Sequence, residues 1–171
     1  SSVQYEDQGT MENAYTLSKV FADEILKLYR FQYGIQVTNM YYYSVYGPRE
    51  ADYGPYSTVI RRFKQRLAEK ESLEIFGNGS KKRDFTFVKD VVRNMMRMIE
   101  DDKVMSGETA EVHFGRGKPV SILDVAKAFD HPFVYKFDLP GEAQTTHCLS
   151  PYGEYECEVL DYITAWRKYS G

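Results

Sequence analysis

The first long hydrophobic pattern in the chain runs from about residue 11 to residue 33. Apolar side chains recur there at spacings of three and four, which predicts an amphipathic helix. They are Ala14, Leu17, Val20, Phe21, Ile25 and Leu28. Gly34 follows, where a glycine commonly ends a helix. Residues 35–45 are rich in Ile, Val, Thr and Tyr and predict a strand. A helix joined to a strand by a short turn is typical of an α/β sheet with parallel strands.

The rest of the chain alternates between helical and extended patterns. A second helix is expected over 57–70, with one apolar face made of Val59, Ile60, Phe63 and Leu67. Strands are expected over 73–76, 84–88, 111–114 and 132–137, with a Gly-Asn-Gly-Ser turn at 77–80. Further helices are expected over 91–100, with Met95, Met98 and Ile99 facing inward, over 121–129 and over 160–169.

Polar residues at three predicted helix starts support these boundaries. Ser57 and Thr58 begin the second helix with a reasonable cap, and Asp90 can cap the helix over 91–100. Ser121 and Asp124 form a capping box in which aspartate stands in the glutamate position. Each start signal therefore comes from a short polar side chain that can accept a backbone N–H.

Composition limits the classes of function. The 171 residues are 43% hydrophobic, enough for one core, or at most for one domain and part of another. Acidic and basic residues are mixed along the chain with a net charge of −3 and no basic stripe, so no nucleic-acid partner is expected. The longest apolar runs, such as residues 37–46, are far too short for a membrane span, so no membrane partner is expected.

Cysteine and histidine usage predicts neither a disulfide framework nor a metal site. Cys148 and Cys157 have no metal-ligand spacing, which fits a reducing compartment and a cytoplasmic protein. The three histidines, His113, His131 and His147, share no spacing and are expected to be structural. No signal peptide is recognised at the start of the chain.

Tyr15 and Lys19 stand one helical turn apart in the first predicted helix. A lysine ammonium at that distance favours the phenolate form of a tyrosine, whose pKa is about 10 when unperturbed. Such a pair can transfer a proton, and the same lysine can reach a cofactor ribose. The chain has 15 tyrosines, however, so the spacing alone favours two surface residues on an amphipathic helix.

Four segments in a consistent order change that interpretation. They are Tyr15-Thr-Leu-Ser-Lys19, Tyr42-Tyr-Ser44-Val-Tyr-Gly-Pro-Arg49, Ile75-Phe76-Gly-Asn-Gly-Ser-Lys-Lys-Arg83-Asp-Phe-Thr-Phe-Val-Lys-Asp-Val91, and Pro140-Gly-Glu142-Ala-Gln144. Together the segments resemble the C-terminal half of the extended short-chain dehydrogenase/reductase family. That family comprises NAD-dependent nucleotide-sugar epimerases, dehydratases and related enzymes, and the UDP-sugar 4-epimerases are the branch that the segments resemble most.

The resemblance implies a partial Rossmann-like, doubly wound parallel sheet that lacks its N-terminal strands, plus a small C-terminal α/β substrate-binding domain. Residues 1–56 would be the last part of the NAD-binding domain with the catalytic helix. Residues 57–171 would be mainly the domain that binds the nucleotide sugar. The strand over about 111–115 would be able to return to the main sheet.

The resemblance also implies roles for individual residues. Tyr15 and Lys19 would be the catalytic couple, and Ser2, or Ser1 beside it, the assisting hydroxyl. Tyr15, Lys19 and Tyr42 would contact NAD.

Four further residues would hold the nucleotide sugar: Ser44, Phe76, Arg83 and Glu142. A planar guanidinium such as that of Arg83 suits a diphosphate. Either Ile75 or Phe76 would pack on the base, and a carboxylate such as that of Glu142 can accept both hydroxyls of a ribose. Ser44 would lie at the carboxyl end of a strand, where ligands bind in open α/β sheets.

Two functions remain open at this stage. The first is an NAD-dependent nucleotide-sugar epimerase, or a dehydratase or reductase of the same family. The second is a nucleotide-sugar binding or assembly module without turnover, because the Gly-rich loop that binds the cofactor pyrophosphate is absent from the sequence. The expected partner is a second copy bound through the 11–33 helix, or a missing N-terminal half.

Overall fold

The computed structural model describes residues 14–50, 57–107 and 110–170. Its helices are α1 (Ala14–Tyr33), α2 (Val59–Ala68), α3 (Val88–Ile99), α4 (Asp102–Met105), α5 (Ile122–Ala128) and α6 (Val159–Ser170). Its strands are β1 (Asn39–Tyr42), β2 (Val45–Tyr46), β3 (Leu73–Phe76), β4 (Lys82–Arg83), β5 (Thr86–Phe87), β6 (Glu111–Phe114), β7 (Val120–Ser121) and β8 (Phe133–Lys136).

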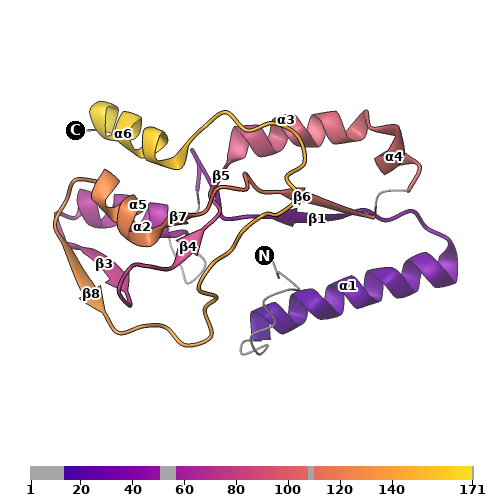
Figure 1. Cartoon of the computed structure of the whole chain (residues 1–171), viewed down its shortest axis with the longest axis horizontal. Coiled ribbons are helices and arrows are strands. Elements are labelled where there is room, and N and C mark those ends of the chain that lie inside the picture. Colours follow the sequence, from indigo (N-terminus) through magenta and orange to yellow (C-terminus); the bar gives the residue numbers. More distant parts are fainter. Residues whose placement is uncertain (1–13, 51–56, 108–109, 171) are drawn as a thin grey trace.

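Parallel strand pairs occur both around β1 and around β3, as the alternation of helices and strands predicts. β1 pairs with β6 from Asn39↔Glu111 to Tyr42↔Phe114, between α3 on one face and α1 on the other (Figure 1). β2 pairs with β5, and β3 pairs with β8 from Leu73 to Phe76. The pairing of β1 with β6 joins segments about 70 residues apart, so the later half of the chain completes the sheet begun by the first strand.

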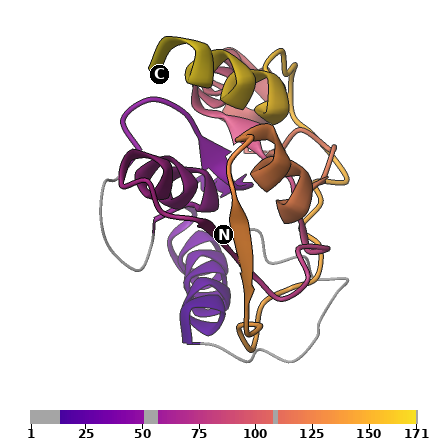
Figure 2. The same cartoon turned by 90° about the vertical axis from the view of Figure 1, so that its left-hand side faces the viewer.

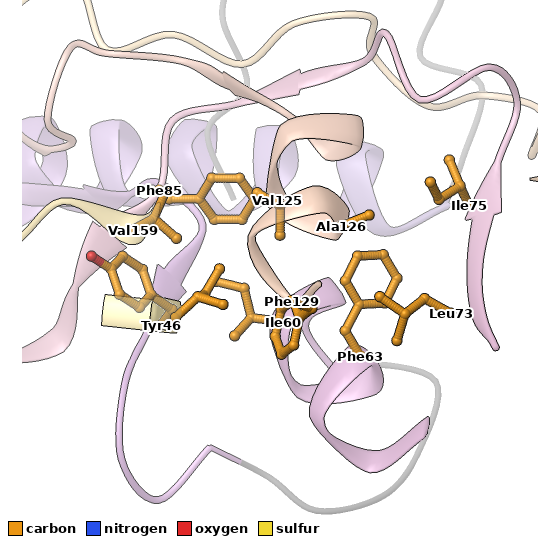
Figure 3. Close-up of a cluster of buried hydrophobic side chains, with 11 residues drawn as sticks. Tyr46, Ile60, Phe63, Leu73, Ile75, Phe85, Val125, Ala126, Phe129 and Val159 are labelled. Atoms are coloured by element: carbon orange, nitrogen blue, oxygen red, sulfur yellow. The ribbon is translucent and has the colours of Figure 1, made fainter. Parts of the chain in front are cut away.

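The larger core lies between α2, α5, α6 and β3. Aromatic and aliphatic side chains from these elements converge there (Figure 3), with Phe63 and Phe129 packed edge to face at 5.7 Å. Thr58 caps α2 by accepting from the Arg61 N–H, and Ser121 caps α5 by accepting from the Asp124 N–H, which confirms both caps. Figure 2 shows α6 at one end of the molecule and α1 at the other.

The expected cap at Asp90 is wrong. α3 begins at Val88, and its N-cap Phe87 makes no side-chain capping hydrogen bond. Asp90 is instead buried in the first turn, where its carboxylate accepts from the backbone N–H groups of Glu156 and Cys157 at 3.1 Å. A distant segment therefore uses the oxygens that a local cap would have used.

Three other expectations are corrected. Ile99 is 55% exposed, because it is the last residue of α3 and lies beyond the apolar cluster that Met95 and Met98 join. The strand expected over 84–88 is reduced to β5, because Val88 already begins α3 and Asp84 is buried with its carboxylate bound to backbone N–H groups of other segments. The strand expected over 35–45 breaks near Ser44, whose φ is 33°.

Residues 147–158, called the connecting segment below, form neither helix nor strand between the last loop and α6. Buried side chains bind its backbone: Asp84 accepts from the Cys148 N–H at 2.8 Å, and Asn94 both accepts from and donates to the backbone of Glu154. Asp90 binds its far end, as described above. Among the described helices, none combines the length and apolarity that a membrane crossing requires.

Candidate functional site

A pocket of about 200 Å³ lies between α2, β3, β4 and the loop that follows β8. All four predicted substrate-binding residues line it: Ser44, Phe76, Arg83 and Glu142. The other lining residues are Tyr46, Thr58, Val59, Ile60, Arg62, Glu74, Lys81, Phe85 and Ile122. The structure therefore brings together residues that are nearly 100 positions apart in sequence, although their roles remain predictions.

Arg83 is aimed into the pocket by the short strand β4, which pairs antiparallel with β7 through Lys82↔Ser121 and Arg83↔Val120. Its Nη1 donates to the carbonyls of Lys82 and Ala143, both at 2.9 Å. Burial lowers the pKa of this guanidinium, and the Glu142 charge acts in the opposite direction. Arginine nevertheless stays charged in proteins, so the pocket holds a fixed cation.

Glu142 faces two cations. Its Oε2 lies 3.4 Å from Arg83 Nη2 and 3.3 Å from Lys81 Nζ. Lys81 also lies 2.5 Å from Asp138, and this ammonium holds the pKa of the Asp138 carboxyl below its usual range. Sequence reasoning missed Lys81, although it stands in the same turn-and-strand segment as Arg83.

Ser44 occupies a strained turn between β1 and β2. Its φ of 33° is uncommon for a residue other than glycine, and such strain persists only where surrounding contacts impose it. Its carbonyl accepts from the Thr86 N–H at 3.3 Å, which ties the turn to β5. Ser44 thus lies just past the carboxyl end of β1, the edge of an open α/β sheet where ligands bind.

Phe76 ends β3, and its ring lies beneath the guanidinium of Arg62 from α2, 5.7 Å from guanidinium carbon to ring centroid. Both side chains line the pocket, and each offers a flat surface on which a base can stack. Arg62 was not predicted from sequence. Its position, four residues after the Thr58 cap on an exposed helix face, carries no local signal for ligand binding.

The tyrosine-lysine pair is described only in part. Tyr15 and Lys19 both belong to α1, which confirms the helix under them, and Lys19 is exposed. Nothing is described for the side chain of Tyr15, and Ser1 and Ser2 lie outside the described residues. The catalytic roles of Tyr15, Lys19 and Ser2 therefore stay predictions.

Asp23 shows how α1 is placed on the sheet. The Tyr41 hydroxyl donates to Asp23 Oδ2 at 3.0 Å, and α1 runs antiparallel to β1 (Figure 1). Position 15 lies about 12 Å from Asp23 along the helix, and Ser44 lies about 10 Å from Tyr41 along the chain. The first turn of α1 is therefore level with Ser44, at the edge of the sheet that carries the pocket.

Tyr42, predicted to contact the cofactor, faces the other side. Alternate residues of a strand point to opposite faces. Tyr41 reaches α1, whereas the ring of Tyr42 stacks on Phe114 at 5.4 Å and its hydroxyl lies 3.7 Å from the sulfur of Met95 on α3. These contacts give no support to the cofactor role of Tyr42, which stays a prediction.

The histidines contact other protein groups. His113 Nδ1 lies 3.1 Å from the Tyr43 hydroxyl, and burial lowers the pKa of His113. His131 and His147 hydrogen-bond the carbonyls of Glu71 and Gly117. Within residues 14–50, 57–107 and 110–170, no three His, Cys, Asp or Glu side chains gather in a way that could hold a metal ion.

Comparison with known families decides the classification. The model of the NAD dependent epimerase/dehydratase family matches residues 3–112, more than half of the chain. The chain belongs to the NAD dependent epimerase/dehydratase family. This confirms the family resemblance drawn from the four sequence segments. The match includes α1, the Ser44 turn and Arg83, but it ends before Glu142.

Relatives of this epimerase/dehydratase-family chain are named for several reactions. It is 31% identical over 135 residues to a putative UDP-glucose 4-epimerase of Methanocaldococcus jannaschii, covering 76% of this chain and 42% of that protein. It is 32% identical over 116 residues to dTDP-4-dehydro-6-deoxy-D-allose reductase of Streptomyces bikiniensis, covering 68% and 34%. The chain thus spans less than half the length of these relatives.

Solved structures confirm the fold. An epimerase from Methanothermobacter thermautotrophicus superposes with a TM-score of 0.80 at 22% identity, covering 99% of this chain and 55% of that one. UDP-glucuronic acid 4-epimerase from Bacillus cereus, solved with UDP-glucuronic acid and NAD, gives 0.73 at 23% identity, covering 91% and 51%. The epimerase/dehydratase-family chain is therefore part of a Rossmann-like α/β fold with a partial parallel sheet.

Proposed function

We propose that this chain is the catalytic-helix and substrate-binding part of an NAD-dependent nucleotide-sugar epimerase, with 4-epimerisation of a UDP-sugar as its reaction. The observation that carries the proposal is the convergence of Ser44, Phe76, Arg83 and Glu142 on one pocket. Each offers the chemistry that one part of a nucleotide sugar needs.

Binding in the pocket would follow the order of the groups in a nucleotide sugar. Phe76 and Arg62 offer flat faces to the base, Glu142 accepts ribose hydroxyls, and Arg83 grips the diphosphate. Ser44 would then face the sugar at the sheet edge level with the first turn of α1. Binding energy from the nucleotide thereby positions the sugar for a reaction elsewhere in the site.

At the sugar, Tyr15 would remove the proton from the reacting hydroxyl, Lys19 would hold Tyr15 as phenolate, and Ser2 would hydrogen-bond the reacting oxygen. Bound NAD supplies the hydride acceptor and donor for such chemistry. Lys19 fits a cofactor ribose because it is exposed on α1, one turn N-terminal to the Asp23 contact with the sheet. For Tyr42 the Met95 contact argues for a structural place instead.

The names of the relatives support the chemistry of the family as a whole, but they do not single out one stereochemical outcome. The matched proteins include UDP-sugar epimerases, a decarboxylase and a reductase, and a structural neighbour is a 5,6-dehydratase. We choose the 4-epimerase because the Methanocaldococcus jannaschii relative is described as a putative UDP-glucose 4-epimerase and a Bacillus subtilis relative as an uncharacterized UDP-glucose epimerase. We also propose that residues 1–56 are the last part of the NAD-binding domain and that residues 57–171 are mainly the substrate-binding domain. We propose a cytoplasmic location for the protein.

Calorimetric titration of this chain with UDP and with NAD tests the proposal. We expect UDP to bind and the Arg83→Ala variant to lose at least about tenfold in affinity, since a charge-assisted diphosphate contact is removed. Lys82→Ala, an exposed change on the same strand, is the matched control and should bind UDP normally. UDP affinity that is equal in both variants would contradict the proposed site.

A second candidate function, nucleotide-sugar binding and assembly without turnover, rests on α1. Large apolar side chains of this helix are exposed: Phe21, Ile25, Leu26, Leu28, Tyr29, Phe31 and Tyr33. Phe21 and Ile25 each lie two residues from Asp23, about 200° round the helix, so they point away from the sheet. Micromolar NAD binding by this chain alone would exclude the non-catalytic module, and UDP binding without NAD binding would favour it.

A further inference from the structure

The pocket contains a cation to which the proposed function gives no role. Lys81 is only 5% exposed, yet its ammonium contacts two carboxylates, Asp138 at 2.5 Å and Glu142 at 3.3 Å. Lysine is rarely buried unless it is paired, because moving its charge out of water is costly. Two carboxylates on one buried ammonium therefore indicate that Lys81 holds a neighbouring side chain in position.

Asp138 is the half-exposed partner of Lys81, with 51% of its side chain accessible. It packs against Gly77, where an added Cβ would lie 3.1 Å from the Asp138 carboxyl carbon, and Gly77 has a φ of +73°. Asp138 Oδ1 also accepts from the Leu139 N–H at 2.8 Å. Two backbone groups thus contact the Asp138 carboxylate, and this carboxylate pairs with the Lys81 ammonium.

Glu142 is the second carboxylate that contacts Lys81, and it has a role in the proposed function. Arg83 and Lys81 contact the same carboxylate oxygen, Oε2, so Glu142 is shared between two cations. In the proposed function Arg83 binds a diphosphate. Lys81 then remains as the second cation on Glu142, and Asp138 contacts Lys81 from the other side.

We propose that Lys81 is a positioning residue that orients Glu142 toward the 2′- and 3′-hydroxyls of a ribose, and thereby makes the pocket prefer ribonucleotides to 2′-deoxyribonucleotides. The inference rests on the proposed function and adds to it the residue that sets the ribose preference. A hydrogen bond to a fixed charged acceptor is among the stronger ones, so one missing hydroxyl should change affinity measurably.

Calorimetry with UDP, 2′-deoxy-UDP and uridine on the full chain tests the inference. We expect the unchanged chain to bind UDP about tenfold more tightly than 2′-deoxy-UDP, and Lys81→Met to reduce that preference to less than about twofold. Lys81→Arg should restore the preference in part. Lys82→Met, an exposed change beside it, should leave the preference intact, and thermal melts establish that each variant is folded.

Three results would overturn the inference. An equal loss of affinity for UDP and 2′-deoxy-UDP in Lys81→Met would mean a merely structural role. A loss for UDP with none for uridine would mean direct contact with phosphate. Absence of UDP binding in the unchanged chain would overturn the proposed function as well, which separates that failure from a failure of the Lys81 assignment alone.

Discussion

Phe129, directly after α5, is fully buried, whereas Phe31 on α1 is 90% exposed. The difference reflects how two regions of the molecule place their apolar side chains. Around β3, the helices α2, α5 and α6 close a core on themselves. Around β1, helix α1 keeps a polar contact with the sheet and turns apolar side chains outward. A hydrophobic pattern thus predicts that a helix face will be buried. It does not tell whether the same chain or another molecule buries that face.

The largest expected effect is in the closed region. Phe129→Ala removes a side chain packed on Phe63 and Trp166 and should lower the free energy of unfolding by about 3–5 kcal/mol. Phe31→Ala, the matched change on α1, should lower it by less than about 0.5 kcal/mol. Urea unfolding at low protein concentration measures both. Equal losses would end the distinction between the two regions.

The next effect concerns the polar contacts that join the regions. Asp84 accepts from the backbone N–H groups of Arg116, Gly117 and Cys148, and it is fully buried. Asp84→Asn sets an amide NH₂ against one of these donors and should cost about 2–4 kcal/mol by urea unfolding.

Asp130→Asn is the control for that change. Asp130 is exposed, its φ is +45°, which asparagine tolerates, and its ion pair with Arg167 lies at the surface. A loss below about 1 kcal/mol is expected there. A comparably small loss for Asp84→Asn would show that the three backbone contacts contribute little to stability.

A smaller effect appears at high pH. Burial, and then the Asp84 charge, raises the pKa of the Cys148 thiol from 9.0 to about 11. The unfolded chain therefore releases this proton first, so stability falls as pH rises from 9 to 11, by up to about 1.4 kcal/mol per unit. Unfolding of Cys148→Ala between pH 8 and 11 should have a shallower slope. The Tyr43 hydroxyl, whose pKa burial raises to about 12, titrates in both proteins.

The smallest effect on folding should accompany the largest effect on association. Phe21→Glu combined with Leu28→Glu changes the outward face of α1 and should alter the monomer's unfolding free energy by less than about 1 kcal/mol. If a second copy covers this face, sedimentation velocity should show self-association weakened at least tenfold, roughly. Tyr33→Glu, about 140° round the helix from Leu28, should leave association unchanged. A chain that is monomeric from the start would contradict a second copy as the partner of this face.

Sequence predicted best what depends on local segments. The strand over 73–76, the Ser121 cap and the pocket residue Arg83 all follow from short motifs whose meaning does not depend on distant partners. Glu142 was equally predictable, because its loop motif stands in family order. For the same reason the family and its Rossmann-like fold were identified from four segments of the chain.

The remainder could not be predicted because it depends on long-range contacts. Asp90 looks like a cap until Glu156 and Cys157, more than 60 residues later, are seen to donate to it. Lys81 looks like an ordinary charged residue in a turn until Asp138 and Glu142 close over it. In each case the local sequence indicates a polar side chain correctly but does not identify its partner.

The connecting segment has a consequence for how the protein tolerates mutation. Asp84, Asp90 and Asn94 bind its backbone, so these contacts do not depend on the identity of the residues that they hold, provided that the main chain keeps its course. Gly153 is one position where the course of the main chain sets the residue, since its φ is +82° and an added Cβ would lie 2.2 Å from Asn94 Oδ1. In a library of random variants, the three acceptors and this glycine should resist substitution, as should segment residues with side-chain partners of their own, such as Tyr152, whose hydroxyl donates to Asp101.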